Sequence, residues 1–243
     1  MGTLLNRRRY MGGGESPKEY LTFEDAEVWR ICCENWGDYN EIVITDNGDN
    51  TVDIATTPVH MENTTSTRGT TITQYNVDNT GGIYTAGTTK EAVGITKEQC
   101  EVVTAIGKDN TSGTTPFTNN SLIVKFNELS YFKNLTIMGR HMFYNCSNLK
   151  EFTIPGSVTI IGSYAFSTTL SVETVWCYPT AAPTLRANAL GQSSSYMMGK
   201  NHRTDGTNKF HVPNGATGYT SGYYGGALIN ASTGCGFTVV YDL

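Results

Sequence analysis

The residues that commonly carry catalysis are scattered along this 243-residue chain and form no known catalytic motif. The four histidines are His60, His141, His202 and His211. No two of them lie four residues apart, and the chain has no zinc-binding HExxH pattern, no G-x-S-x-G nucleophile elbow and no phosphate-binding P-loop. Glu98 and Glu101 fall on a predicted helix without a partner carboxylate, which favours a solvated face. We therefore predict a protein that is not an enzyme, with no catalytic residue, no bound metal and no cofactor.

The six cysteines also argue against a chemical role. They are Cys32, Cys33, Cys100, Cys146, Cys177 and Cys235. None belongs to a C-x-x-C pair, so a zinc site is not expected. Cys32 and Cys33 are neighbours within a predicted helix and cannot bridge one another there. We predict free thiols buried in the core.

Two other groups of residues have the character of contact surfaces. The first group is Arg7, Arg8 and Arg9, which precede three glycines in a basic arm over residues 1–17. These arginines suit carboxylates on a partner, and a disordered tail is the alternative. The second group is Tyr219, Tyr223 and Tyr224. Tyr among Gly and Ser suits protein or glycan contacts, and the alternative is that these rings fix the C-terminal segment onto the preceding repeat.

The overall composition excludes several classes of protein. Charged residues make up 16% and aromatic residues 11%, and the 26 glycines favour strands and loops over long helices. A net charge of −5 does not steer the protein toward nucleic acid. No apolar run approaches the roughly 20 residues of a membrane span. The first residues resemble neither a signal peptide nor a myristoylation signal, so we expect assembly in a cytoplasm.

An internal repeat predicts the elements that position these residues. The segments MGRHMFYNCSNLKEFTIP and IGSYAFSTTLSVETVWCY are two copies of one pattern. Gly139 and Gly162 are 23 residues apart, as are Phe143 and Phe166. A period in the twenties is typical of leucine-rich solenoids, in which each repeat adds a strand and a return segment and buries its apolar side only against its neighbours. We therefore expect parallel rungs that place Phe143 beside Phe166.

The front of the chain contains two predicted helices. The first covers residues 22–36, with Thr22 as its cap and an apolar face on one side. The second covers residues 95–106 and begins with a capping box formed by Thr96 and Gln99. Between them, EIVITDNGDNTVDIATTPV has the alternation and turn residues of a β-hairpin.

These elements predict a mixed α+β, β-rich chain in three parts. The parts are a basic Gly-rich anchoring arm (1–17), a helix pair interrupted by a β-rich insertion at about 41–93 (18–121), and a leucine-rich-repeat-like solenoid with a C-terminal cap (122–243).

The repeat sequence resembles a known family. IMGRHMFYNCSNLKEFTIPGSVTIIGSYAF (137–166) is similar to the leucine-rich repeats of BspA-type surface antigens. The blocks AEVWRICCENWGD (26–38), GITKEQCEVVTAIG (94–107) and FNELSYFKNLTIMG (126–139) resemble a helix pair that precedes such repeats in proteins of gut Bacteroidetes and their phages. The resemblance implies a solenoid that presents a surface for attachment.

In those proteins the segment between the helices resembles a calcium loop with ligands at alternate positions. Here Gly37 follows Trp36 where the pattern has an acid, and the insertion interrupts the rest. We therefore carry no calcium site over. The polar residues of this segment are expected in turns: Asp38, Asn40, Asp46 and Asp49.

The opening LLNRRRYMGGG resembles the first residues of virion structural proteins of Bacteroidetes phages, including crAss-like phages. This resemblance implies a non-enzymatic head or tail fibre or decoration protein, anchored by its arm to other virion proteins. Its repeats would contribute to attachment to a host surface glycan or protein, with several copies acting together. We expect a homo-oligomer and no nucleic acid or membrane partner. A bacterial cell-surface or secreted leucine-rich-repeat adhesion module is the alternative.

Overall fold

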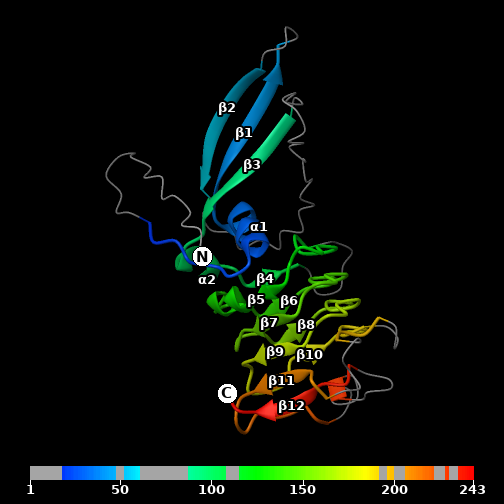
Figure 1. Cartoon of the computed structure of the whole chain (residues 1–243). Coiled ribbons are helices and arrows are strands. Elements are labelled where there is room, and N and C mark those ends of the chain that lie inside the picture. Colours follow the sequence, from blue (N-terminus) through cyan, green and yellow to red (C-terminus); the bar gives the residue numbers. More distant parts are fainter. Residues whose placement is uncertain are drawn as a thin grey trace, which may run out of the picture.

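A solenoid of parallel strands carries two helices at one end, and a three-stranded antiparallel sheet projects from that end (Figure 1). This computed structural model describes the following residues: 18–47, 52–60, 87–107, 115–191, 196–199, 206–221, 228–229 and 235–243. The β-rich, leucine-rich-repeat-like fold expected from the sequence is confirmed.

The solenoid consists of two parallel sheets, and from β4 to β11 the chain alternates between them. The first sheet has the order β10-β8-β6-β4 and the second has the order β12-β11-β9-β7-β5. The strands of the first are β4 (Ala105–Ile106), β6 (Ile137–Met138), β8 (Ile160–Ile161) and β10 (Thr184–Leu185). The strands of the second are β5 (Lys125–Phe126), β7 (Glu151–Ile154), β9 (Thr174–Cys177), β11 (Lys209–Val212) and β12 (Thr238–Tyr241).

The predicted stacking of Phe143 on Phe166 is confirmed. Their ring centroids lie 5.5 Å apart with an interplanar angle of 27°, and the Phe143 N–H donates to the carbonyl of Ala165 at 2.7 Å. Phe152 and Val175, which share the same period, are in register between β7 and β9. All four side chains are buried, so each rung covers the apolar side of the next.

A column of glycines permits the rungs to approach this closely. The Gly139 N–H donates to Ile106 O at 2.8 Å, and the Gly162 N–H donates to Met138 O at 2.7 Å. A Cβ atom at Gly162 would lie 2.5 Å from the Gly139 carbonyl carbon. Because the obstructing atoms belong to the backbone of the preceding rung, no side chain fits at this position.

Helix α1 (Ala26–Trp36) closes one end of the core, and Asp25 fixes it there. One Asp25 oxygen accepts from the α1 backbone, at 3.0 Å from Glu27 N and 3.2 Å from Val28 N. The other oxygen accepts from Val124 N at 2.7 Å, just before β5. Asp25 is therefore the helix cap, and the prediction of Thr22 was wrong, because Asp25 satisfies the helix amides and those of the first rung together.

The second helix is shorter than predicted. Helix α2 (Lys97–Glu101) begins with the predicted capping box, in which Thr96 and Gln99 exchange hydrogen bonds. It ends at Glu101, however, and Ala105–Ile106 forms strand β4, paired in register with Ile137–Met138. The apolar residues at the end of the predicted helix thus belong to the first rung of the solenoid. A short 3₁₀ helix, η1 (Asn127–Tyr131), follows β5.

The projecting sheet contains β1 (Asp38–Asp46), β2 (Val52–His60) and β3 (Gly87–Gly94) in the order β2-β1-β3. The predicted hairpin is confirmed, because β1 and β2 pair antiparallel with Ile44 opposite Ile54. The expectation of turn residues was wrong for Asp38, Asn40 and Asp46, which belong to β1. Asn40, for example, donates to Glu91 on β3 at 3.1 Å. Asp49 lies outside the described residues.

Asp38 is the junction between this sheet and the helices. Its buried carboxylate accepts from Lys18 Nζ at 2.9 Å, Tyr20 Oη at 2.6 Å and Gln99 Nε2 at 2.8 Å, and it also pairs with His60 at the end of β2. Burial alone would raise the pKa of Asp38, but the hydrogen bonds from Lys18, Tyr20, His60 and Gln99 lower it below its ordinary value. One charged group therefore joins the chain before α1, two strands and α2.

Gly162→Ala should lower the free energy of unfolding by about 2–3 kcal/mol, because the new methyl group would push apart two rungs that are in backbone contact. Urea denaturation followed by circular dichroism measures the change. Gly156→Ala is the matched control, since its Cβ would lie 3.6 Å from the nearest atom of Tyr178, an ordinary contact. Equal stability of the two variants would contradict the stacking argument.

Asp38→Asn should cost about 1–3 kcal/mol of unfolding free energy at pH 7, since charge-assisted hydrogen bonds are lost. The folded-state pKa of Asp38 is lowered, so its contribution is present at neutral pH. It disappears as the pH falls from the ordinary Asp pKa of about 3.9 through the folded value. The wild type should therefore converge on the variant in acid, as urea titrations from pH 7 to pH 2.5 would measure. Exposed Asp53→Asn is the control, and a deficit that persists unchanged at the lowest pH would refute the prediction.

Candidate interaction surface

The five-stranded sheet presents one of its faces outward, and we call this surface the open face. Along its strands, Phe152, Val175 and Phe210 point into the core, while the residues next to them point out. The strands are in register, so outward residues of successive rungs form rows across the sheet. The open face comprises Lys125, Asn127, Glu151, Trp176, Tyr178, Lys209, His211 and Asp242. Thr153 shares a row with Trp176 and His211 but is buried.

Glu151 organises one half of the open face. Its Oε1 atom accepts from Asn127 Nδ2 at 2.8 Å and from the indole Nε1 of Trp176 at 2.9 Å. Its other oxygen lies 3.6 Å from Lys125 Nζ. Burial would raise the pKa of Glu151, but the bonds from Trp176 and Asn127, together with the charge of Lys125, lower it. A charged carboxylate therefore fixes the Trp176 ring in one orientation.

A second carboxylate fixes the other half. The rings of Trp176 and His211 are stacked, with centroids 4.2 Å apart and an interplanar angle of 21°. His211 Nδ1 lies 2.9 Å from Asp242 Oδ1 on the far side. The aromatic pair is thus held at both ends by acidic side chains and is partly buried, with 15% of the His211 side chain exposed. Rigid aromatic groups lose little conformational entropy when a partner binds.

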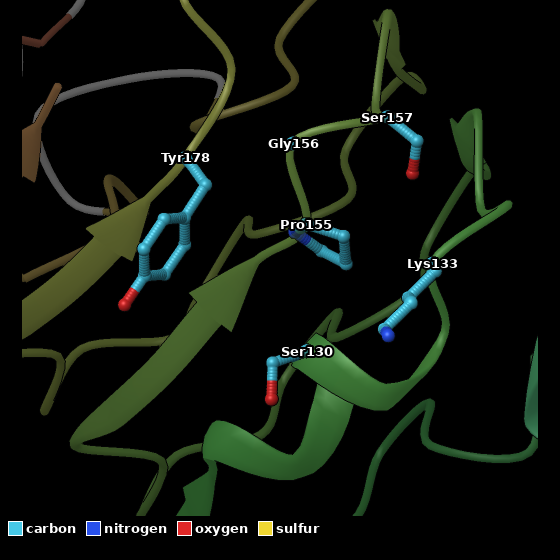
Figure 2. A pocket seen from close by; sticks show the side chains of 6 residues that line it. All are labelled: Ser130, Lys133, Pro155, Gly156, Ser157 and Tyr178. Carbon is cyan, nitrogen blue, oxygen red and sulfur yellow. The ribbon is translucent and has the colours of Figure 1, made fainter. Parts of the chain in front are cut away.

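A shallow depression of about 330 Å³ adjoins the open face, and we call it the edge depression (Figure 2). It lies where β7 and β9 end. Its lining residues are Ser130, Lys133, Pro155, Gly156, Ser157 and Tyr178. Figure 2 shows Pro155 between the Tyr178 ring and Lys133, with Ser130 on the 3₁₀ helix η1. Tyr178 is 46% exposed and follows Trp176 by two residues, so the depression continues the aromatic part of the open face.

The cysteine side chains belong to the core and not to the open face. All six cysteines are free and buried, which confirms their predicted state. Burial raises the pKa of the Cys146 and Cys177 thiols to about 12, so neither supplies a thiolate near neutral pH. Among the described residues, no group of three or more His, Cys, Asp or Glu side chains could hold a metal ion. No helix in the described part of the chain is long and apolar enough to span a membrane.

The structure assigns Tyr219 to the core, not to a contact surface. Its side chain is completely buried, its hydroxyl donates to Pro179 O at 2.8 Å, and it lies 3.3 Å from Cys177 Sγ. Tyr219 therefore fixes the C-terminal segment onto β9, and its expected contact role is corrected. The remaining predicted contact residues lie outside the described residues: Arg7, Arg8, Arg9, Tyr223 and Tyr224.

Sequence reasoning did not select the residues that form the open face. Trp176 appeared only as part of a repeat, and His211, which lies in β11, appeared only among the histidines that form no catalytic motif. A usable signal existed, because both are aromatic side chains at outward positions of adjacent strands. To use this signal, one must know the register of β9 with β11. The 31 residues between these strands do not follow the 23-residue repeat, so the register cannot be read from the sequence.

Two stacked parallel sheets around a core of periodic apolar residues define a leucine-rich-repeat-like β-solenoid. Residues 110–196 match the family model described as BspA type Leucine rich repeat region (6 copies), so this part of the chain is similar to such repeats. The match covers little more than a third of the sequence. No curated protein and no solved structure shows a significant match to the chain. Repeats of this type suggest a protein-interaction or adhesion module and do not correspond to a known enzyme family.

Proposed function

We propose that this protein is a non-enzymatic attachment protein that binds a host surface glycan or protein through the open face. The observation that carries the proposal is the stacked pair Trp176–His211, held between Glu151 and Asp242 on an outward sheet face. Large aromatic side chains fixed by their neighbours are the usual centres of binding energy in interfaces. The polar groups around them would determine orientation and specificity.

We further propose that the protein is a structural component of a phage virion. The resemblance of LLNRRRYMGGG to virion proteins supports this location, with Arg7, Arg8 and Arg9 as the anchor to capsid, tail or fibre subunits. Many copies on one particle would strengthen weak individual contacts with the host surface. The same open face would serve a bacterial surface or secreted adhesion module, which is the alternative.

Trp176→Ala and His211→Ala should each weaken binding to host cells by at least about tenfold, because each removes half of the aromatic pair. Fluorescently labelled full-length protein and a panel of gut Bacteroidetes strains would provide the measurement. Tyr196→Ala is the matched control, since Tyr196 is 52% exposed and lies outside the open face. Circular dichroism and thermal melting verify that each variant folds. Unchanged binding by both folded open-face variants would reject this surface as the attachment site.

The virion location makes a separate prediction about the basic arm. Mass spectrometry of purified particles should detect the protein with its arm present, and deletion of residues 1–14 should give a folded protein that no longer incorporates. Replacement of the three arginines by glutamine should weaken incorporation while circular dichroism of the purified protein stays unchanged. Recovery of the protein in a bacterial outer-membrane fraction, and its absence from particles, would favour the alternative.

A further inference from the structure

We infer that the edge depression binds a sugar ring that carries a carboxylate, such as a uronic or sialic acid residue of a surface polysaccharide. The inference rests on the proposed function, because it names the ligand class that the attachment surface would take. It concerns a different set of side chains from the Trp176–His211 pair, so the two ideas can be tested apart.

Lys133 provides the charge that a carboxylate requires. Its side chain is 61% exposed, and Lys133 is one of the residues that line the depression. Its acidic neighbour is Glu101, at 3.8 Å, and that side chain is itself 32% exposed. An ion pair at this distance, with one partner exposed and the other partly exposed, contributes little to stability. A ligand carboxylate can therefore replace Glu101 as the partner of Lys133 at small cost.

The opposite wall suits the apolar face of a sugar ring. Tyr178 presents almost half of its surface to solvent, and Pro155 lies between it and Lys133 (Figure 2). Binding sites for small molecules combine such aromatic surfaces with a few well-placed polar groups. The Tyr178 ring and Lys133 lie on opposite sides of Pro155, so a saccharide that contacts both would lie across Pro155 (Figure 2).

Hydroxyl groups complete the depression. Ser157 Oγ donates to Leu135 O at 2.7 Å, so its proton is committed and its lone pairs remain able to accept from a sugar hydroxyl. Ser130 is exposed at the edge of the depression, on η1. The site therefore offers an acceptor as well as the three N–H donors of Lys133, which matches the mixed hydrogen bonding of a saccharide.

The shape of the depression suits one sugar unit that lies against it with its other face in solvent. Its volume is about 330 Å³. It is open and shallow, whereas the centre of a protein interface is typically an apolar pocket that becomes fully dry. Because Tyr178 and Trp176 lie on the same side of β9, a longer oligosaccharide can continue from the depression onto the Trp176–His211 pair.

Gly156 is a position at which a larger side chain can be introduced to block the depression. A Cβ atom there would lie 3.6 Å from the Tyr178 carbonyl oxygen and 3.7 Å from Tyr178 Cβ, which are ordinary contacts. The backbone at Gly156 therefore accepts a side chain without rearrangement. A large side chain would occupy the depression, while a methyl group would leave most of it open.

The test is isothermal titration calorimetry of the full chain with two pairs of saccharides. One pair is the tetramer of galacturonic acid and its methyl ester, and the other is sialyllactose and lactose. At least one acidic member should bind, and its uncharged match should bind roughly tenfold more weakly or not at all. Lys133→Met should reduce the affinity roughly tenfold, and Gly156→Trp should abolish binding. Gly156→Ala and the exposed Lys150→Met are matched controls that should retain it.

Three results would overturn the inference: no binding of either acidic saccharide, equal binding of charged and uncharged partners, or full affinity in both Lys133→Met and Gly156→Trp. Competition on cells separates this failure from failure of the proposed function. If the wild type binds cells through Trp176 but acidic saccharides do not compete, the depression is not the sugar site and the ligand is of another class, such as a protein. If the wild type binds no cells, the attachment function itself is rejected.

Discussion

The whole structure depends on the contact of each rung with the next. A single repeat has too little apolar surface to be stable, and it becomes stable only when Phe143, Phe166 and their equivalents cover one another. The backbone must approach to hydrogen-bonding distance at the same time, which Gly139 and Gly162 permit. Apolar burial and close backbone contact thus impose the same period on the chain.

A stack of this kind has two open ends, and the chain deals with the first by means of helices. Trp36 of α1 packs on Phe117 and Phe132, so the aromatic core continues without interruption from the rungs into the helical end. Asp25 couples the first amides of α1 to those before β5. The projecting sheet, in turn, is joined to this end through the buried carboxylate of Asp38. Asp25 and Asp38 therefore connect the solenoid to helix α1 and to the projecting sheet.

The periodic features of the fold could be predicted from the sequence. The features that depend on contacts between different parts of the chain could not. The spacing of Phe143 and Phe166 was sufficient to predict parallel rungs, and Thr96 with Gln99 was sufficient for the start of α2. The end of α2 was missed because Ala105–Ile106 pairs with Ile137–Met138, more than 30 residues away. Asp38 was assigned to a turn by its residue type, although its partners Tyr20 and Gln99 come from opposite sides of the sequence. Residue type alone cannot distinguish a turn aspartate from a buried one.

The same periodicity explains where specificity can arise in this molecule. Inward positions such as Phe152 and Val175 are restricted to apolar residues by the stack, whereas the outward positions between them carry no such requirement. At those positions the repeats differ, with Thr153, Trp176 and His211 in one row across three strands. The aromatic pair of this row also joins neighbouring rungs, because Trp176 bonds to Glu151 on β7 and stacks on His211 of β11. The solenoid therefore supplies a rigid framework. The outward positions, whose residue type the core does not determine, are the ones at which the side chains can differ to recognise a partner.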